Sequence, residues 1–276
     1  MTTVHGPTTL TASLPMYNLP EMRSRNEAFW DALAEELRRD GWTNLPARLS
    51  LADAAVPYGI ESDVLFSQTC GYPLQTIHRG QGRLLGVPTY DAPGCRAGTH
   101  RAFIVVRKDS RFEKPEDLKG ASFALNSRDS NTGMNLPRLL FARLAGGKPF
   151  FGSVVETGGH ASSIERVASG ELDTASIDCV TYVFLQDHRP DAVGSLRIVA
   201  ETAESPALPF VTSSATPADK AARLQAALFR LAADPDRRPV LEGLRLRTIS
   251  KPDPAAYAGL LDYMREAAEL GYPELA

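Results

Sequence analysis

Residues 126–137 read Asn126-Ser-Arg-Asp-Ser-Asn-Thr-Gly-Met-Asn-Leu-Pro137, directly after a strand-like run at residues 121–125. An apolar pattern at helical spacing follows this segment. Because proline is tolerated only in the first turn of a helix, Pro137 predicts a helix start near residues 132–134. The segment is therefore interpreted as a strand, a short polar turn and the beginning of a helix.

Such a helix start can hold an anion. The N–H groups of the first turn have no partner within the helix, and the helix dipole places partial positive charge there. Ser130, Asn131 and Thr132 add hydroxyl and amide groups at the same point. A small oxyanion can be held this way without a lysine or a metal. The alternative is an ordinary N-cap, which favours the same residue types.

The composition excludes several classes of protein. The chain has 276 residues, 43% hydrophobic and 23% charged, with a formal net charge of −3. It is long enough for one large domain or two smaller ones, and no basic excess indicates a nucleic-acid surface. No apolar run approaches the roughly 20 residues of a membrane span. The N-terminus shows no signal peptide, so we expect a cytoplasmic protein as the sequence stands, or a periplasmic one if a leader was removed.

Strand and helix patterns alternate along the chain. The predicted strands are residues 8–14, 47–51, 63–66, 83–90, 101–107, 121–125, 153–156, 174–177, 196–200 and 208–212. The other predicted helices are residues 21–40, 53–58, 114–120, 161–169, 178–186, 218–233, 240–244 and 255–270. This alternation predicts an α/β fold with largely parallel sheets. Ligands of such sheets bind at the turns beyond the carboxyl ends of the strands.

Nine short motifs follow one another in the chain. They are Met16-Tyr-Asn-Leu-Pro20, Ser67-Gln-Thr-Cys-Gly-Tyr-Pro73, Phe103-Ile-Val-Val106, Asp117-Leu-Lys-Gly120, the segment from Thr132-Gly133 through Pro137-Arg138, Thr157-Gly-Gly-His160, Gly170-Glu-Leu-Asp173, Ile177-Asp-Cys-Val-Thr-Tyr182 and Leu208-Pro-Phe-Val-Thr212. As an ordered set, from Leu14 to about Thr212, they resemble the phosphonate-binding proteins of ABC importers, within the type II periplasmic-binding-protein fold.

The resemblance implies two α/β lobes, each a mostly parallel sheet flanked by helices, joined by two hinge strands. Ligand is clamped between the lobes. Carried onto this chain, lobe 1 is residues 1–98 plus 214–276 and lobe 2 is residues 103–204. The crossings are expected near residues 98–103 and 205–213.

The resemblance also implies a ligand site. In phosphonate binders of this kind, a Ser-Thr-Ser-Gly turn and a histidine after Thr-Gly-Ser or Gly-Gly-Ser hold the phosphonate oxygens. Here the turn reads Ser130-Asn131-Thr132-Gly133, and the histidine is His160. Asn131 replaces the middle hydroxyl, and Asp129 adds a carboxylate, which disfavours a dianion unless it points away. The sequence therefore favours a monoanion, a carboxylate or a polar neutral ligand over phosphonate itself.

A clamp gains from its ligand only if both lobes contact it, so candidates are expected on each side. The full set is Tyr17, Gln68, Thr69, Tyr72, Ser130, Asn131, Thr132, His160, Asp178 and Tyr182. Asp178 and Tyr182 are expected at the far end of the ligand. Other roles are open: Asp178 as an N-cap, His160 as a helix-start residue that bonds backbone, and Tyr17 and Tyr72 as packed tyrosines.

The remaining histidines and the cysteines suggest no metal or cofactor. His5, His78, His100 and His188 have no metal-ligand spacing and are expected to be structural or exposed. Cys70, Cys95 and Cys179 form no zinc pattern. Cys70 and Cys95 both follow strand-like segments and are candidate neighbours, free in a reducing cytosol. Cys179 is expected to be a buried free thiol rather than a nucleophile.

We therefore predict a monomeric solute-binding protein that captures a small polar, anionic ligand by lobe closure for an ABC importer. Its expected partners are that ligand and a membrane permease, with no nucleic acid and no cofactor. We expect no enzymatic activity, because the chain has no Gly-x-Ser-x-Gly elbow, phosphate-loop motif or HExxH. The alternative is a cytoplasmic enzyme or ligand sensor that reuses the fold.

Overall fold

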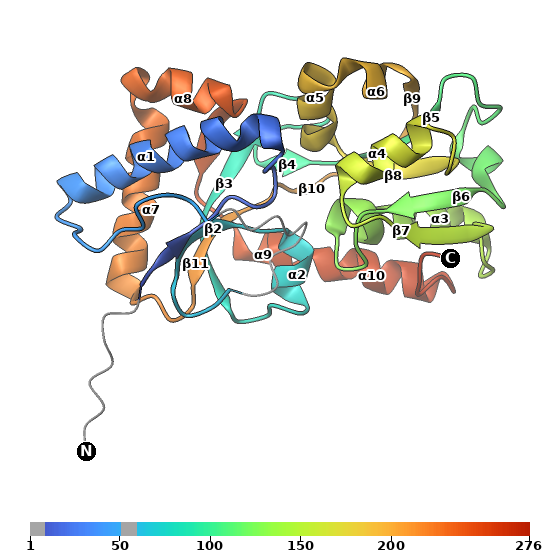
Figure 1. Cartoon of the computed structure of the whole chain (residues 1–276). Helices are drawn as coiled ribbons and strands as arrows, with labels where there is room; N and C mark the ends of the chain where they lie inside the picture. Colours follow the sequence, from blue (N-terminus) through green and yellow to red (C-terminus); the bar gives the residue numbers. More distant parts are fainter. Residues whose placement is uncertain (1–8, 51–59) are drawn as a thin grey trace.

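The computed structural model describes residues 9–50 and 60–276, which form two lobes side by side (Figure 1). The first lobe is built on a five-stranded sheet of order β1-β2-β11-β3-β12, and the second on a five-stranded sheet of order β7-β6-β8-β5-β9. The first sheet comprises β1 (Thr11–Ala12), β2 (Val64–Gln68), β11 (Phe210–Ser213), β3 (Gly82–Tyr90) and β12 (Leu246–Ser250). The second comprises β7 (Ser153–Glu156), β6 (Ser122–Leu125), β8 (Thr174–Asp178), β5 (Ala102–Arg107) and β9 (Leu196–Glu201). The predicted two-lobed α/β fold is confirmed.

The sheets are mixed, and the expectation that they are mostly parallel was wrong. β6 runs parallel to β7 and β8, and β1 runs parallel to β2. β5 is antiparallel to both of its neighbours, and so is β11. The reason is the chain path. These two strands follow the crossings between the lobes, so each starts at the edge of the sheet where its neighbours end.

A two-stranded antiparallel ribbon marks the crossings. It pairs β4 (Thr99–His100) with β10 (Ser205–Pro206). Both segments lie within or beside the predicted crossing regions, at residues 98–103 and 205–213. The ribbon's two-residue strands are too short to leave a pattern in the sequence, so only the extended segments beyond them were predicted.

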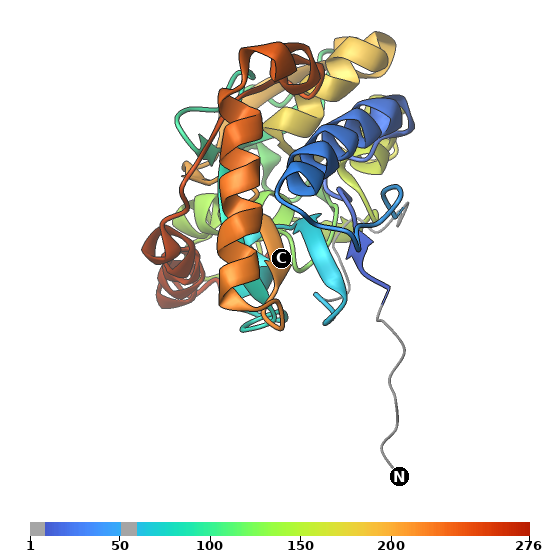
Figure 2. The same ribbon diagram turned by 90° about the vertical axis from the view of Figure 1, so that its left-hand side faces the viewer.

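Three helices cover one face of the first sheet: α1 (Arg23–Arg39), α7 (Ala218–Ala233) and α8 (Arg238–Gly243). Figure 2 shows α7 in orange and α1 in blue lying next to each other. Helical spacing places Phe29, Leu33 and Leu37 on the buried face of α1. The Phe210 ring stacks on both Phe29 and Phe66, with ring centroids 5.6 and 5.4 Å apart. This aromatic stack is the centre of the first lobe.

The C-terminal helices reach from the first lobe to the second. α9 (Pro254–Ala258) packs on α2 (Gly71–Gln75), whereas α10 (Leu260–Glu269) contacts both α2 and α3 (Leu136–Ala145). The carbonyl oxygen of Ala276 accepts hydrogen bonds from the amides of Phe150 and Phe151, at 2.7 and 3.1 Å. These contacts place the C-terminal segment of predicted lobe 1, from α10 to Ala276, against the second lobe. The predicted lobe boundaries stay a prediction.

The second lobe has helices on both faces of its sheet (Figure 1). α4 (His160–Ala168), α5 (Cys179–His188) and α6 (Pro190–Gly194) lie on one face, and α3 lies on the other. The run Phe103 to Val106 in β5 is fully buried between β8 and β9. Within the described residues, the 3₁₀ turns are Pro20–Met22, Pro115–Leu118 and Pro235–Arg237.

Some local predictions differ from the structure. Residues 47–50 of the predicted strand 47–51 form no strand; Leu49 is buried, and its amide donates to the Glu27 carboxylate at 3.3 Å. Residue 51 and the predicted helix 53–58 lie outside the described residues. β12 was not predicted, because only Leu246 and Ile249 of its residues are buried and arginine interrupts the apolar pattern.

The aromatic stack generates a stability prediction. Replacing Phe66 with Ala leaves a cavity beside Phe29 and Phe210, so we expect the free energy of unfolding to fall by about 3–5 kcal/mol. The matched control is Ile77→Ala, since that side chain is 52% exposed and should change stability by less than about 0.5 kcal/mol. Urea denaturation measures both. Equal, small changes in the two variants would contradict the packing described.

Candidate functional site

The predicted helix start is a π-helical turn, Asn131–Asn135, which continues into α3. The amide of Leu136 donates to the carbonyl of Asn131, and the amide of Gly133 donates to Ser130 Oγ at 2.9 Å. Ser130 is thus the N-cap, and the helix begins one residue earlier than expected. Turns of this kind are frequent at functional sites.

Pro137 explains how the turn is tied to the sheet. It has no N–H, so it cannot donate to the Thr132 carbonyl one π-turn earlier. Ser176 in β8 takes that role, with its hydroxyl donating to the Thr132 oxygen at 2.6 Å. The start of the helix is therefore fixed against the carboxyl end of β8.

A small cavity of about 30 Å³ lies at this point, between the lobes. It is lined by Met16, Tyr17, Cys70, Asn126, Ser130, Thr132, His160, Asp178, Thr181 and Leu208. A water molecule needs about 10–15 Å³ of such space, so the cavity has room for about two. The starts of the π-turn, α4 and α5 all meet here. In this conformation the lobes enclose a space for a small polar group.

Several buried polar atoms around the cavity lack partners. Among the described residues, Tyr17 Oη, Asn126 Oδ1 and His160 Nδ1 have no hydrogen-bond partner, and all three residues line the cavity. Thr69 Oγ1, next to Cys70 in the chain, is in the same condition. Each unsatisfied buried group costs about 1–3 kcal/mol, and native proteins have few of them. Their gathering at one cavity indicates a place where a ligand supplies the missing partners.

His160 is the first residue of α4, and its half-buried ring packs against the π-turn. Nε2 lies 3.3 Å from Thr132 Oγ1. Burial lowers the pKa of His160 below its ordinary value, and the nearby Asp178 carboxylate only partly opposes this. The ring is therefore neutral at pH 7. A neutral ring that accepts from Thr132 at Nε2 carries its proton on Nδ1, the atom without a partner.

Asp178 is an N-cap and also lines the cavity. It caps α5, because its Oδ1 accepts from the amides of Val180 and Thr181 at 2.9 and 3.1 Å. Its side chain also lines the cavity. Oδ2 lies 2.9 Å from Nδ1 of His100, a buried residue of β4. Burial acts to raise the pKa of Asp178, but the His100 hydrogen bond and charge outweigh it and hold that pKa below its usual value.

Tyr17 brings the first lobe to the cavity. Its ring packs edge-on against Tyr90 of the first lobe and Phe184 of α5, with centroids 5.3 and 5.8 Å away. Burial raises the pKa of Tyr17, so the phenol keeps its proton. Tyr17 is therefore a packed tyrosine, and it also lines the cavity.

Half of the predicted site residues line the cavity: Tyr17, Ser130, Thr132, His160 and Asp178. Gln68, Thr69, Tyr72, Asn131 and Tyr182 do not. The amide of Gln68 donates to Tyr90 Oη and the Leu208 carbonyl, both at 3.0 Å. The side-chain amide of Asn131 donates to Ser205 Oγ at 2.9 Å. The hydroxyl of Tyr72 contacts Met264 Sδ, and the ring of Tyr182 packs edge-on against Phe103. These four side chains are engaged within the fold.

The sequence prediction missed four residues that line the cavity: Met16, Cys70, Asn126 and Leu208. Thr181, at the same predicted helix start as Asp178 and Tyr182, also lines it. The sequence did point to Asn126, since it is the first polar residue after β6 and opens the polar turn of residues 126–137. His100 was expected to be structural or exposed, and its contact with Asp178 was not foreseen. Cys95 was expected to lie next to Cys70, but its neighbour is Cys179. The sulfur of Cys70 instead accepts a hydrogen bond from the backbone N–H of Asn131.

A wider hollow of about 220 Å³ adjoins the cavity and shares Met16, Asn126, His160 and Thr181 with it. Arg189 lines this hollow, but its guanidinium is bound to Glu21 and Glu165, at 2.9 Å each. The cavity has no Lys or Arg among the residues that line it in the described chain. Hydrogen bonding rather than cationic charge therefore determines what it can hold.

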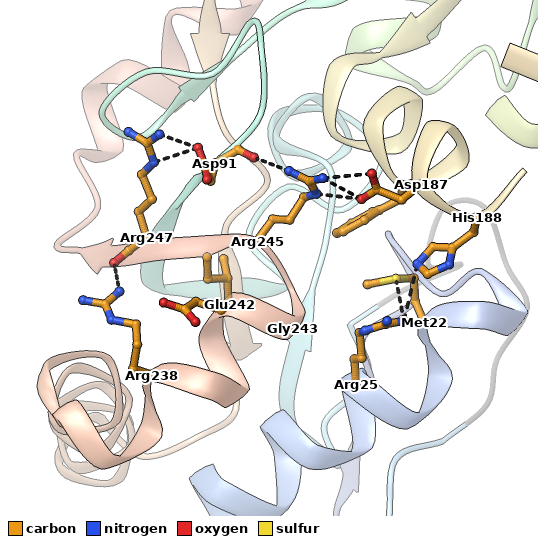
Figure 3. A pocket seen from close by; sticks show the side chains of 12 residues that line it. Met22, Arg25, Asp91, Asp187, His188, Arg238, Glu242, Gly243, Arg245 and Arg247 are labelled. Atoms are coloured by element: carbon orange, nitrogen blue, oxygen red, sulfur yellow. Dashed lines mark hydrogen bonds and ion pairs between the residues drawn. The ribbon is translucent and has the colours of Figure 1, made fainter. Parts of the chain in front are cut away.

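A larger pocket, about 480 Å³, lies elsewhere, between α1, α5, α8 and β12 (Figure 3). Arg245 forms a bidentate ion pair with Asp187, at 2.7 Å, and Arg247 pairs with Asp91. Arg245 is held with a positive φ of 53°. None of the described residues that line this pocket carries a buried polar atom without a partner. Despite its smaller volume, the interlobe cavity is the better candidate for a ligand site.

The described residues offer neither a metal-binding cluster nor a membrane-spanning helix. Residues 9–50 and 60–276 contain no cluster of three or more His, Cys, Asp or Glu side chains suited to a metal ion. Their helices are also too short or too polar to cross a bilayer.

The fold and the enclosed cavity define a two-lobed binding protein. Residues 12–257 match the family described as ABC transporter, phosphonate, periplasmic substrate-binding protein, and the chain belongs to that family. A methylphosphonate-bound PhnD1 from Prochlorococcus marinus is 16% identical, with a TM-score of 0.73, over 96% of this chain and 100% of that one. A binding component of a Pseudomonas aeruginosa phosphonate transporter is 15% identical, with a TM-score of 0.73, over 95% of this chain and 87% of that one. A Xanthomonas citri protein bound to ATP is 19% identical, with a TM-score of 0.70, over 95% of this chain and 98% of that one. No curated protein matches the chain in a sequence search.

Membership of this family confirms the predicted resemblance and makes the chain a solute-binding protein of the ABC-importer type. At these low identities, the solved structures establish the shared fold.

The close approach at the π-turn generates one prediction. A Cβ at Gly133 would lie 1.7 Å from Asn126 Oδ1, so Gly133→Ala must displace Asn126 or the turn. We expect the free energy of unfolding to fall by about 1–3 kcal/mol, as measured by urea denaturation. Gly194→Ala is the control, because a Cβ there meets nothing within 4 Å. If both variants keep wild-type stability, the turn does not have the described geometry.

Burial of His160 generates a pH prediction. Because the folded-state pKa is lowered from 6.5, the unfolded chain binds a proton below that pH that the folded chain does not. The free energy of unfolding should therefore fall as pH drops from about 7 to about 5. His160→Gln should flatten this slope. The lowered pKa of Asp178 acts only below about 4, outside this window.

Proposed function

We propose that this protein captures a small, singly charged oxyanion that also carries an O–H or N–H donor, such as a monoprotonated phosphonate. The supporting observation is the gathering of three partnerless buried polar atoms, on Tyr17, Asn126 and His160, around one interlobe cavity. The ligand completes their hydrogen bonds, and its oxyanion end lies at the start of the π-turn. The bound form is then delivered to the membrane permease of an ABC importer.

The contacts assign a role to each side chain. His160 donates from Nδ1 to a ligand oxygen, because Thr132 occupies Nε2. Ser130 Oγ accepts from the Gly133 amide and keeps its own hydroxyl proton for the ligand. Asn126 Oδ1 is an acceptor without a donor, so it requires a protonated group on the ligand. Tyr17 Oη closes the site from the first lobe.

Charge favours a monoanion over a dianion. Asp178 lines the cavity, and its lowered pKa keeps it ionised near neutral pH. No Lys or Arg among the described lining residues offsets a second negative charge. Like charges a few ångströms apart in a buried site repel strongly, and a dianion there would be forced to take up a proton. The Asp129 carboxylate, which raised this issue in the sequence, does not line the cavity.

Two observations support binding without turnover. Cys70, the thiol that lines the cavity, has its pKa raised to about 11 by burial, so it is not an activated nucleophile. Both oxygens of the Asp178 carboxylate are engaged, with the α5 amides and with His100. We propose that the protein works as a periplasmic monomer and catalyses no reaction, with neither cofactor nor nucleic acid involved.

Ligand titration tests the proposal. Isothermal titration calorimetry should show binding of methylphosphonate or inorganic phosphate, whereas acetate, which has no O–H or N–H donor for Asn126, should bind more weakly. Thr132→Ala and His160→Ala should then each weaken the affinity by about tenfold or more, the equivalent of about 1.4 kcal/mol. Ser169→Ala, at the exposed far end of α4, is the control and should bind like wild type.

Melting temperatures of the ligand-free variants separate binding from structure. Nδ1 of His160 has no partner, and Nε2 makes one long contact, 3.3 Å to Thr132 Oγ1, so His160→Ala should melt within a few degrees of wild type. A large loss of stability with unchanged affinity would show that these residues serve the fold instead.

A further inference from the structure

Two thiols from different parts of the chain lie in contact beside the ligand cavity. Cys95 Sγ and Cys179 Sγ are 3.4 Å apart, and both cysteines are free. Cys179 is fully buried, whereas Cys95 is partly exposed to solvent. Disulfide sulfurs are about 2.05 Å apart, so a bond needs a movement of about 1.4 Å, within reach of side-chain rotation.

The backbone holds this contact from both sides. Cys95 lies in the loop of residues 91–98, between β3 and β4, and the Asp91 amide anchors the loop to the Arg245 carbonyl at 2.6 Å. Cys179 is the first residue of α5, and its amide donates to the Arg101 carbonyl at 3.1 Å. Gly94 has a φ of +84°, and a Cβ there would lie 3.1 Å from Cys179 Cβ. The glycine therefore allows the loop to press directly on the start of α5.

We propose that Cys95 and Cys179 form a disulfide when the protein meets a small-molecule or protein disulfide as oxidant. The bond joins the segment that leaves the first sheet to α5 of the second lobe. It would lie one residue from Asp178, whose carboxylate lines the cavity and contacts His100 of the crossing ribbon. This inference does not depend on the identity of the ligand.

The chemistry is thiol–disulfide exchange. The Cys95 thiolate attacks one sulfur of the oxidant disulfide, and the first thiolate leaves. The Cys179 thiolate then attacks Cys95 Sγ in the mixed disulfide, and the second thiolate leaves. The two cysteine protons pass to the two leaving thiolates, and the oxidant is reduced by two electrons. Contact with Cys95 and burial raise the pKa of Cys179, so the partly exposed Cys95 reacts first.

The cross-link closes a long loop, from residue 95 to residue 179. Closing a loop of this length removes conformations from the unfolded chain and typically stabilises the folded state by a few kilocalories per mole. For a protein of this size we expect the melting temperature to rise by about 5–10 °C on oxidation.

Thiol counting and peptide mapping test the proposal on the full chain. After equilibration with oxidised glutathione and removal of the reagent, wild-type protein should lose two of its three thiols. Digestion under non-reducing conditions should yield a peptide pair that joins Cys95 to Cys179. The Cys70→Ser variant should form the same bond and show the same rise in melting temperature.

Cys95→Ser and Cys179→Ser are the matched variants that should show neither the peptide pair nor the rise. Three free thiols in the oxidised folded wild type would overturn the proposal. A cross-link that joins Cys70 to Cys95 would also overturn it. So would a rise in melting temperature on oxidation of Cys95→Ser equal to that of wild type.

Discussion

The missing N–H of Pro137 is the constraint on which the site depends. With no donor at that position, the carbonyl of Thr132 must find a partner outside its own helix, and Ser176 provides it at 2.6 Å. The bond fixes the wide turn of residues 131–135 against β8, two residues before Asp178. It also directs the side chain of Thr132 to His160, at the start of α4. One absent backbone donor thus sets the relative positions of three helix starts.

The cavity that results is polar but poor in cationic charge. It offers a neutral histidine, hydroxyl groups, an amide oxygen and an ionised carboxylate. Each buried atom without a partner carries a desolvation cost of about 1–3 kcal/mol. A ligand that satisfies these atoms removes the cost only when the lobes are closed. Differential affinity of this kind is what shifts a population of open and closed molecules toward closure.

The sequence predicted the elements whose signals are local. The strand at residues 153–156 and the helix at residues 218–233 have the predicted bounds, and Pro137 indicated the helix start to within a residue. Predictions that depend on distant partners were less successful. Asn131 stands in the expected turn, but its amide donates to Ser205, which lies 74 residues away. His100 gave no signal, because only the register of β5 on β8 brings it to Asp178.

Ion pairs between the lobes have a consequence for how this protein is measured. Arg245 with Asp187, and Arg189 with Glu21, each connect a residue of the first lobe to one in or just after α5. All four side chains are about one-third exposed, so dissolved salt reaches them. Separation of the lobes must break these contacts, and added electrolyte weakens them. Dissociation constants obtained in different buffers can therefore be compared only at matched ionic strength.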